Sequence, residues 1–370
     1  MEEDEKSPTP KRGDMLLLKS LIMDKVFLWF LLFVPIAAFA AFFHASATTI
    51  FFLSALAIIP LAKYIGQATE ELAARTSTAL GGLLNVTFGN ATELIIGIFA
   101  LHAGLIQVVK ASITGSILGN LLLVLGTAII AGGATRKKQT FNRAGAMAGG
   151  STLFLGVTAL AIPAVLLIAA PTTSGTSIEH LSILVAICLI ILYLASLFFS
   201  LVTHKHLYAG EVGEEESRWS LSKSIWILLG ATLAVAWMSD MLVGTIDTMG
   251  RNLGWTDLFI GVVIIAIIGN AAEHASAVTM AIKNKMDLAL QVAIGSATQM
   301  AMFVAPVFVF VSLLFRNQMT LVFDTFELVS IFLSILLVNL VIADGESNWL
   351  EGVQLLVAYA IIAIAFFVHP

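Results

Sequence analysis

Two glutamates occur inside strongly apolar segments of this 370-residue chain. Glu93 lies in "GNATELIIGIFAL" and Glu273 lies in "GNAAEHASAV". An ionised carboxylate at the depth of a lipid bilayer costs several kcal/mol unless it is paired or faces a water-filled cavity. The first basic residues that follow them are Lys110 and Lys283, well beyond the motifs. Two such acids predict a functional site that binds cations or protons.

Oxygen-bearing side chains and glycines accompany both glutamates. An asparagine lies three positions before each glutamate and shares its helix face, and the glycine before it can loosen the helix and expose backbone carbonyls to a cavity. The following apolar segments add a hydroxyl and an amide side chain about one helical turn apart. The residues predicted to bind or surround a cation are Glu93, Glu273, Asn90, Asn270, Gly89, Gly269, Ser116, Asn120, Ser296 and Gln299.

This set of ligands consists of oxygen atoms only. Ca2+ accepts an irregular shell of oxygen ligands, Mg2+ requires a tighter octahedron, and zinc favours cysteine or several histidines. The one candidate nitrogen ligand, His274, is next to Glu273 in sequence and points away from its face of a regular helix. Two roles stay open for His274, namely packing or proton coupling through Glu273. The pattern predicts a calcium site in which Glu93 and Glu273 also carry protons.

The composition predicts a membrane protein. Hydrophobic residues make up 59% of the chain and charged residues 12%, with a mean hydropathy of +0.97. Soluble domains have about 25% charged residues, and a run of about 20 apolar residues spans a bilayer. We therefore expect an all-α polytopic membrane protein with about 11 transmembrane helices. The expected spans are Val26–Phe43, Thr48–Gly66, Leu80–Ala103, Leu105–Gly133, Ala144–Ala170, Ile178–Val202, Ser224–Ile246, Asp257–Ile282, Asp287–Phe315, Phe326–Ala343 and Leu350–Val368.

The chain repeats itself at a constant offset of about 180 positions. The residues Gly81, Gly89, Asn90, Ala91, Glu93, Gly115 and Ser116 recur as Gly261, Gly269, Asn270, Ala271, Glu273, Gly295 and Ser296. One extra N-terminal helix followed by two five-helix repeats accounts for the expected spans, and an odd number of helices makes the repeats inverted, as in many transporters.

These repeats divide the chain into five parts. The expected parts are a cytoplasmic disordered tail at 1–25, a first transmembrane helix at 26–47, repeat 1 at 48–203, an acidic connector at 204–223 and repeat 2 at 224–370. The connector has two interpretations, a solvated charged link or a short acidic helix that attracts cations.

The distribution of basic residues predicts the orientation. With the N-terminus inside, 16 lysines and arginines lie on the inner side and 3 on the outer side or near it. Cytoplasmic loops carry such an excess. We expect an integral membrane protein with a cytoplasmic N-terminus and a C-terminus outside or in a lumen. The membrane is either the cell membrane or that of a vacuole-like organelle.

The two motifs resemble the signature repeats of the calcium/proton exchanger (CAX) family. The resemblance extends through "DLALQVAIGSATQMAMFVAPVFV", "RKKQTFNRAGA" and "ADGESNWLEGVQLLVAYAIIAIAFFVHP", and covers almost everything except the tail. It implies that Glu93 and Glu273 bind the cation and take part in proton exchange, with the matching amide and hydroxyl residues around them. Family members often have a proline where this chain has Ala266, which predicts a smaller kink before Glu273.

These observations predict an antiporter that exchanges Ca2+ for H+ by alternating access. An exchanger of Na+ or another cation for Ca2+ is the alternative. Sodium-coupled relatives typically have a hydroxyl residue three positions before each glutamate and a proline directly before it, and this chain has neither. A channel would conduct without a counter-ion, and a metalloenzyme would need a pattern such as HExxH, which neither motif contains.

The expected partners are therefore Ca2+, H+ and the lipid bilayer, with no enzyme activity, no nucleic acid and no cofactor, since Ca2+ is the transported substrate. The oligomeric state stays open, and a homo-oligomer is possible.

Overall fold

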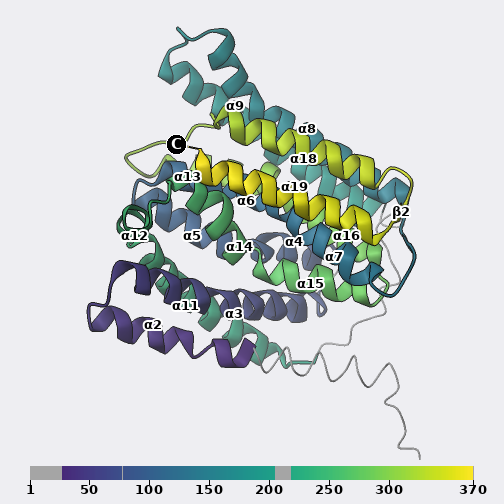
Figure 1. Ribbon diagram of the computed structural model, residues 1–370, viewed down its shortest axis with the longest axis horizontal. Coiled ribbons are helices and arrows are strands. Elements are labelled where there is room, and N and C mark those ends of the chain that lie inside the picture. Colours follow the sequence, from purple (N-terminus) through teal and green to yellow (C-terminus); the bar gives the residue numbers. More distant parts are fainter. Residues whose placement is uncertain (1–26, 77, 205–217, 370) are drawn as a thin grey trace, which may run out of the picture.

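The chain folds into a bundle of helices (Figure 1). The computed structural model describes residues 27–76, 78–204 and 218–369, so the predicted tail and most of the predicted connector lie outside the described residues. In the first half the elements are α2 (Phe33–Phe42), α3 (Ala47–Ala73), α4 (Thr78–Gly89), α5 (Ala91–His102), α6 (Ile106–Leu118), η1 (Gly119–Val124), α7 (Leu125–Gly133), β1 (Gln139–Thr140), α8 (Arg143–Ala169), α9 (Gly175–Phe198) and η2 (Phe199–Thr203).

The second half has a similar series of elements. They are α11 (Leu221–Val243), α12 (Ile246–Leu253), α13 (Asp257–Phe259), η3 (Ile260–Ile265), α14 (Ala266–Gly269), α15 (Ala271–Ile282), α16 (Met286–Gln299), η4 (Met300–Val304), α17 (Ala305–Ser312), α18 (Thr325–Val341), β2 (Glu346–Ser347) and α19 (Trp349–Val368). The strands β1 and β2 form a short antiparallel pair. Helices α2, α3 and α11 lie on one side of the bundle, and α8, α9 and α18 on the opposite side (Figure 1).

Side-chain caps begin many of these helices. Ser46, Ser174 and Ser220 each accept a hydrogen bond from a backbone N–H in the first turn of the helix that follows. At α18 and α19, an aspartate or asparagine and a glutamate three positions later form reciprocal capping boxes. Such caps satisfy backbone donors that a helix start leaves unpaired, and this matters most where lipid offers no alternative partner.

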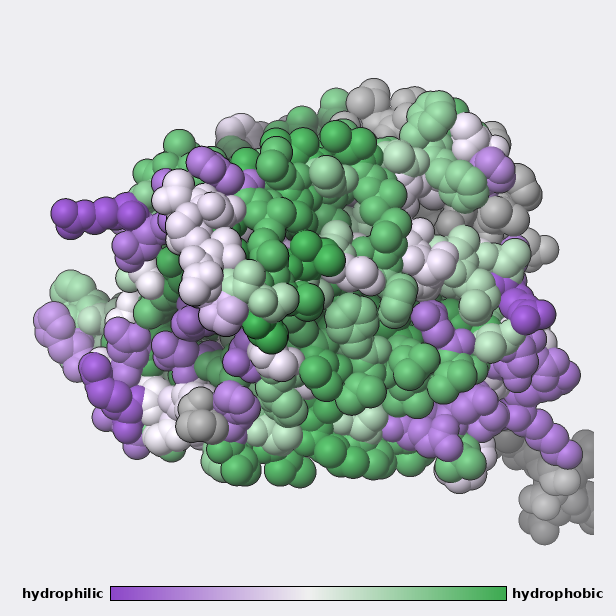
Figure 2. Space-filling view, turned by 90° about the horizontal axis from the view of Figure 1, so that it is seen from above, coloured by the Kyte–Doolittle hydropathy of each residue, from purple (hydrophilic) through white to green (hydrophobic). Residues whose placement is uncertain are grey.

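Seven helices in the described residues are long and apolar enough to span a membrane. They are Ala47–Ala73, Ile106–Gly133, Arg143–Ala169, Gly175–Thr203, Leu221–Val243, Met286–Ser312 and Trp349–Val368. A helix pair bent by 113°, Ile246–Leu253 with Asp257–Gly269, is an eighth candidate. Figure 2 shows apolar side chains across the middle of one face, with hydrophilic side chains gathered toward two opposite ends. This helical, apolar architecture is that of an integral membrane protein.

Two of the expected spans are interrupted at their asparagines. The segment before Glu93 ends as α4 at Gly89 and restarts as α5 at Ala91, and the segment before Glu273 breaks in the same way between α14 and α15. The backbone angles φ and ψ are −100° and 20° at Asn90, and −86° and 15° at Asn270. These values are similar, so the two breaks have a similar local geometry, and the smaller kink expected relative to proline-containing family members stays a prediction. At Asn270 the side-chain amide donates to the carbonyl oxygen of Ala266, a local bond that competes with regular helical hydrogen bonds.

Helix boundaries in the two halves follow the offset found in the sequence. Shifting α5 (91–102) by 180 positions gives 271–282, the bounds of α15, and shifting α6 (106–118) gives 286–298, nearly those of α16. The π-helical turns η1 and η4 also occupy equivalent positions. Sequence reasoning did not predict these turns, the short helix α12 or the strand pair. The two halves therefore share local structure around the glutamates.

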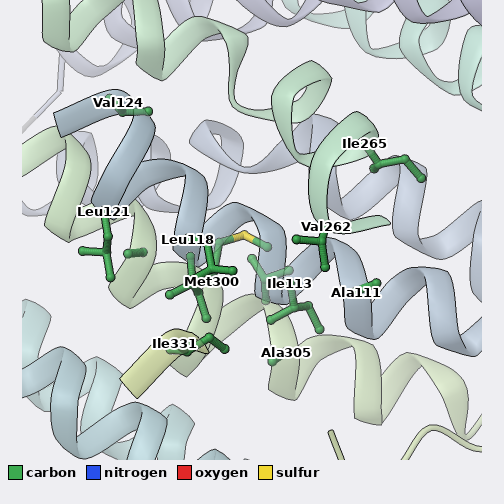
Figure 3. Close-up of a cluster of buried hydrophobic side chains, with 14 of the residues drawn as sticks. Ala111, Ile113, Leu118, Leu121, Val124, Val262, Ile265, Met300, Ala305 and Ile331 are labelled. Carbon is green, nitrogen blue, oxygen red and sulfur yellow. The ribbon is translucent and has the colours of Figure 1, made fainter. Parts of the chain in front are cut away.

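Close packing of α6 against η3 forms the centre of the bundle. A Cβ atom at Gly115 would overlap the backbone of Val262, and one at Gly261 would lie 2.7 Å from the carbonyl oxygen of Val108. Side chains of α6, η1, η3, η4 and α17 then fill the surrounding core (Figure 3). Small residues at such contacts let helix backbones approach, which strengthens van der Waals packing where hydrophobic burial contributes little.

This packing predicts that Gly115→Val destabilises the protein. The added side chain must push η3 away, so we expect the free energy of unfolding in detergent to fall by about 1–3 kcal/mol. Gly230→Val is the matched control, because a Cβ at Gly230 meets no atom within 4 Å. Equal melting temperatures for the two variants would contradict the close contact.

Candidate functional site

The two helix breaks bring Glu93 and Glu273 to the same site. Glu93 lies across Gly269 of the other half, where an added Cβ would be 3.1 Å from its Cγ and 3.3 Å from its Oε1. The carboxylates of Glu93 and Glu273 are close enough for their charges to interact. Each glutamate lies in the first turn of a new helix. The partial positive charge of a helix N-terminus stabilises an anion there, so the breaks also favour ionised carboxylates.

Three of the four carboxylate oxygens of this pair are buried without a donor among the described residues. Glu93 is only 8% exposed, and among the described residues neither of its oxygens has a hydrogen-bond partner. Oε2 of Glu273 and the side-chain oxygens of Asn90 and Asn120 are likewise buried and unpartnered within that part of the chain. Buried polar atoms normally have partners. A cluster of buried acceptors is therefore suited to receive a cation or protons.

A network of amide and hydroxyl groups holds the break at Asn270. The Nδ2 group of Asn120 donates to Oδ1 of Asn270 at 2.7 Å and to Oγ of Ser296 at 2.9 Å. The Nδ2 group of Asn270 in turn donates to Oγ of Ser116 at 2.9 Å and to the carbonyl oxygen of Ala266 at 2.7 Å. This network joins residues of both halves and fixes one broken helix against two intact ones.

The break at Asn90 is held differently. Its Nδ2 group donates to Oε1 of Gln299 on α16. At the offset of 180, Gln299 corresponds to Gly119 and Asn120 corresponds to Met300, so each half supplies an amide that the other half lacks. The residues predicted for the cation site thus lie together across four helical segments, although their hydrogen bonds are not symmetric.

His274 does not belong to this network. Its Nε2 atom is buried and has no hydrogen-bond partner among the described residues. Packing and proton coupling both stay predictions for this side chain.

A cavity of about 180 Å³ leads to Glu273. Its lining residues come from α3, α4, α5, α14, α15 and α16, and sequence reasoning missed most of these residues. The lining residues are Ala62, Gly66, Thr69, Glu70, Asn85, Gly89, Thr92, Gly269, Ala272, Glu273, Ser276 and Val292. The available signal was the spacing of Ala62, Gly66, Thr69 and Glu70, which places small and polar residues along one face of α3.

A second cavity, of about 400 Å³, lies between α8, α9 and α16. It is lined by Asp287, Gln291 and Thr298 along one face of α16 and reaches Gln299, the residue that holds Asn90. Polar groups therefore approach the site by two separate routes.

The described residues contain no group of three or more histidine, cysteine, aspartate or glutamate side chains placed to hold a metal ion. A cation between Glu93 and Glu273 would therefore take its other ligands from amides, hydroxyls, backbone carbonyls or water. Such a mixed oxygen shell is acceptable to Ca2+ and unsuited to a tightly held zinc ion.

Comparison with known proteins agrees with these features. The model of the sodium/calcium exchanger protein family matches residues 46–202 and 223–368. The chain belongs to this family. A Ca2+/H+ antiporter of Synechocystis is 47% identical over 94% of this chain and 98% of its own length. The Ca2+/H+ antiporter ChaA of Bacillus subtilis is 46% identical over 90% of this chain and 96% of its own length.

Solved structures of exchangers have a similar fold. Native YfkE matches with a TM-score of 0.82 and 42% identity, over 92% of this chain and 99% of that one. The H+/Ca2+ exchanger CAX matches with a TM-score of 0.69 over 93% of this chain and 92% of that one, at 16% identity, which supports the fold alone. Members of this exchanger family named in the comparison are antiporters and transporters rather than enzymes.

The amide network predicts that Asn120→Ala lowers stability. The change leaves Oδ1 of Asn270 and Oγ of Ser296 without their donor, so we expect unfolding in detergent to become easier by about 1–3 kcal/mol. Thr127→Val is the control, because the Thr127 hydroxyl only bonds carbonyl oxygens of its own helix. If thermal unfolding does not distinguish the two variants, the network does not hold the break.

Proposed function

We propose that this protein is an antiporter that exchanges Ca2+ for H+ across a membrane. The observation that carries the proposal is the pair Glu93 and Glu273, a buried and a partly buried carboxylate within electrostatic range of each other, with buried oxygens that have no partner among the described residues. Their location at two helix N-termini favours negative charge, and their proximity opposes it. One divalent cation or two protons remove this conflict. The names of the Synechocystis and Bacillus relatives support the same pair of ions.

The coupling follows from the cost of burying uncompensated charge. Closure around an empty, doubly ionised site would sequester two like charges at low dielectric, which is strongly unfavourable. When the helices close around bound Ca2+, or around bound protons, the two carboxylates are neutralised. The helices therefore change access only in loaded states, and Ca2+ moving one way requires protons to move the other way. Since the two acids interact, they titrate as a pair.

Inverted repeats provide a framework for alternating access. One N-terminal helix and two five-helix repeats of opposite orientation, with the glutamates at their interface, fit the sequence offset of 180 and the two segments that match the family model. Transporters of this kind bind their ions near the bilayer midplane, between the repeats. The predicted cytoplasmic N-terminus is supported by the excess of lysine and arginine on one side.

Protons are favoured over sodium as the counter-ion. The position three before each glutamate holds Asn90 or Asn270, and in this structure both amides donate hydrogen bonds to neighbouring side chains. The position directly before each glutamate holds Thr92 or Ala272 rather than proline. Exchange of sodium for calcium is the second candidate, favoured by the description of the family as a whole.

The charge argument predicts that Glu93→Gln and Glu273→Gln each abolish exchange. A single remaining carboxylate cannot cancel both charges of Ca2+, so uptake of Ca2+ into liposomes against an opposed pH gradient should fall at least about 100-fold. Glu346→Gln is the control, since Glu346 is exposed and pairs with Lys138 at 2.6 Å. Undiminished transport by either glutamine variant would refute the proposed roles.

The choice of counter-ion predicts the gradient that drives transport. In liposomes loaded with acid and free of sodium, Ca2+ uptake should proceed, and it should stop when an ionophore collapses the pH gradient. A sodium gradient at uniform pH should drive no uptake. The opposite dependence would establish the sodium-coupled alternative.

A further inference from the structure

The cavity beside α3 extends from the middle of that helix to its exposed end. Four lining residues, Ala62, Gly66, Thr69 and Glu70, occupy one face of α3 over about 12 Å of helix length. Ala62 is buried, whereas Glu70 is exposed and lies three residues before the helix ends at Ala73. Glu70 is therefore at the mouth of the cavity.

The inner part of the cavity contains Glu273. Its Oε2 atom is buried and lacks a partner among the described residues. Thr92, which is 3% exposed, lines the same space, and Asn85 and Ser276 add an amide and a hydroxyl. No lysine, arginine or histidine is among the lining residues. The cavity thus has a carboxylate at its mouth, another in its inner part and neutral oxygen groups along its walls.

The volume of the cavity fits a partly hydrated cation. Its volume of about 180 Å³ is several times the roughly 30 Å³ that one water molecule occupies in the liquid. A Ca2+ ion that keeps some of its water can occupy this space, and the oxygen groups can replace the water molecules that it gives up.

Glu70 is distinguished from its neighbour by what it faces. The next residue, Glu71, accepts a hydrogen bond at 3.0 Å from the backbone N–H of Trp219, and Arg75 donates to the carbonyl oxygen of Trp219. Glu71 in the last turn of α3 and Arg75 just after it thus contact the segment directly before α11. Glu70 lines the cavity, and Glu71 does not.

We propose that this cavity is an access site for Ca2+, in which Glu70 binds the partly hydrated ion before it reaches Glu273. This inference rests on the proposed exchange of Ca2+ for H+. A carboxylate at the mouth of a cleft with low-dielectric walls raises the local concentration of cations and speeds their capture. The ion then exchanges its remaining water for the oxygens of Asn85, Ser276 and Thr92 on its way inward.

Glu70→Gln tests this role in vesicles of fixed orientation. With Ca2+ supplied on the Glu70 side, KM for Ca2+ should rise about 5-fold while the maximal rate is kept, and added salt should reduce the difference. With Ca2+ supplied on the opposite side, KM should stay the same and the maximal rate should fall, because release then passes Glu70. The variant cannot change the equilibrium of the exchange reaction. The ratio of maximal rate to KM must therefore fall by the same factor for Ca2+ supplied on either side of the membrane.

Control variants separate this effect from general surface charge. Glu70→Asp should restore most of the wild-type KM, and Glu346→Gln should leave it unchanged. An unchanged KM on the Glu70 side, or an equal shift of KM on both sides, would overturn the proposal. If Glu93→Gln abolishes exchange while Glu70→Gln behaves as wild type, the proposed exchange stands and the access site fails.

A binding measurement is independent of transport. A Cβ at Gly66 meets no atom within 4 Å, so Gly66→Cys places a thiol in the cavity without a clash, and Cys188→Ser removes the native cysteine. In a chain that also carries Glu93→Gln, millimolar Ca2+ should slow modification of this thiol by a cationic reagent. Adding Glu70→Gln should remove the protection. Protection that persists without Glu70, or is absent with it, contradicts the assignment.

Discussion

The repulsion between a buried and a partly buried carboxylate is the interaction on which this structure depends. Glu93 and Glu273 lie within range of each other's charge, and no described lysine or arginine forms a salt bridge with either of them. A basic partner would neutralise the pair permanently and leave no demand for a transported ion. Helix N-termini compensate part of this charge, and the proposed exchange assigns the remainder to Ca2+ or protons.

The rest of the bundle serves to hold this unfavourable pair in place. Each glutamate needs a helix that starts at the depth of the membrane, and such a start leaves backbone groups that lipid cannot satisfy. Asn90 and Asn270 make the breaks possible, and amides from neighbouring helices hold them through Gln299 and Asn120. The π-helical turns η1 and η4 directly follow the helices that supply these contacts. Turns of this kind are frequent at functional sites.

Equivalent positions in the two halves have different surroundings. Gly115 packs against Val262 so closely that no Cβ fits, whereas a Cβ at Gly295, its equivalent, would meet nothing within 4 Å. Val292 lines the open cavity, while the backbone nitrogen of its equivalent, Ser112, would lie 3.0 Å from a Cβ at Gly261. One half is therefore closed where the other is open. Access to the glutamates from one end of the bundle follows from this difference.

Much of this arrangement could be predicted from the sequence, because it depends on residue types and their spacing. Apolar runs of bilayer length predicted the helical membrane protein, and the offset of 180 predicted that both glutamate motifs have the same local structure. The oxygen-only set of side chains predicts a calcium site, and that chemistry stays a prediction. These features are local, since hydropathy and helix periodicity are determined by neighbours in the chain.

Only the tertiary structure decided which residues meet across the bundle. The pairing of Asn120 with Asn270 and of Asn90 with Gln299 joins positions 150 and 209 residues apart, which no local pattern specifies. The same is true of the cavity that both Glu70 and Glu273 line. In the sequence, Glu70 and Glu71 are equivalent acids near a helix end, and the packing of α3 gives them different surroundings. The chemistry of the site thus follows from composition and spacing, whereas access to it follows from how the helices pack.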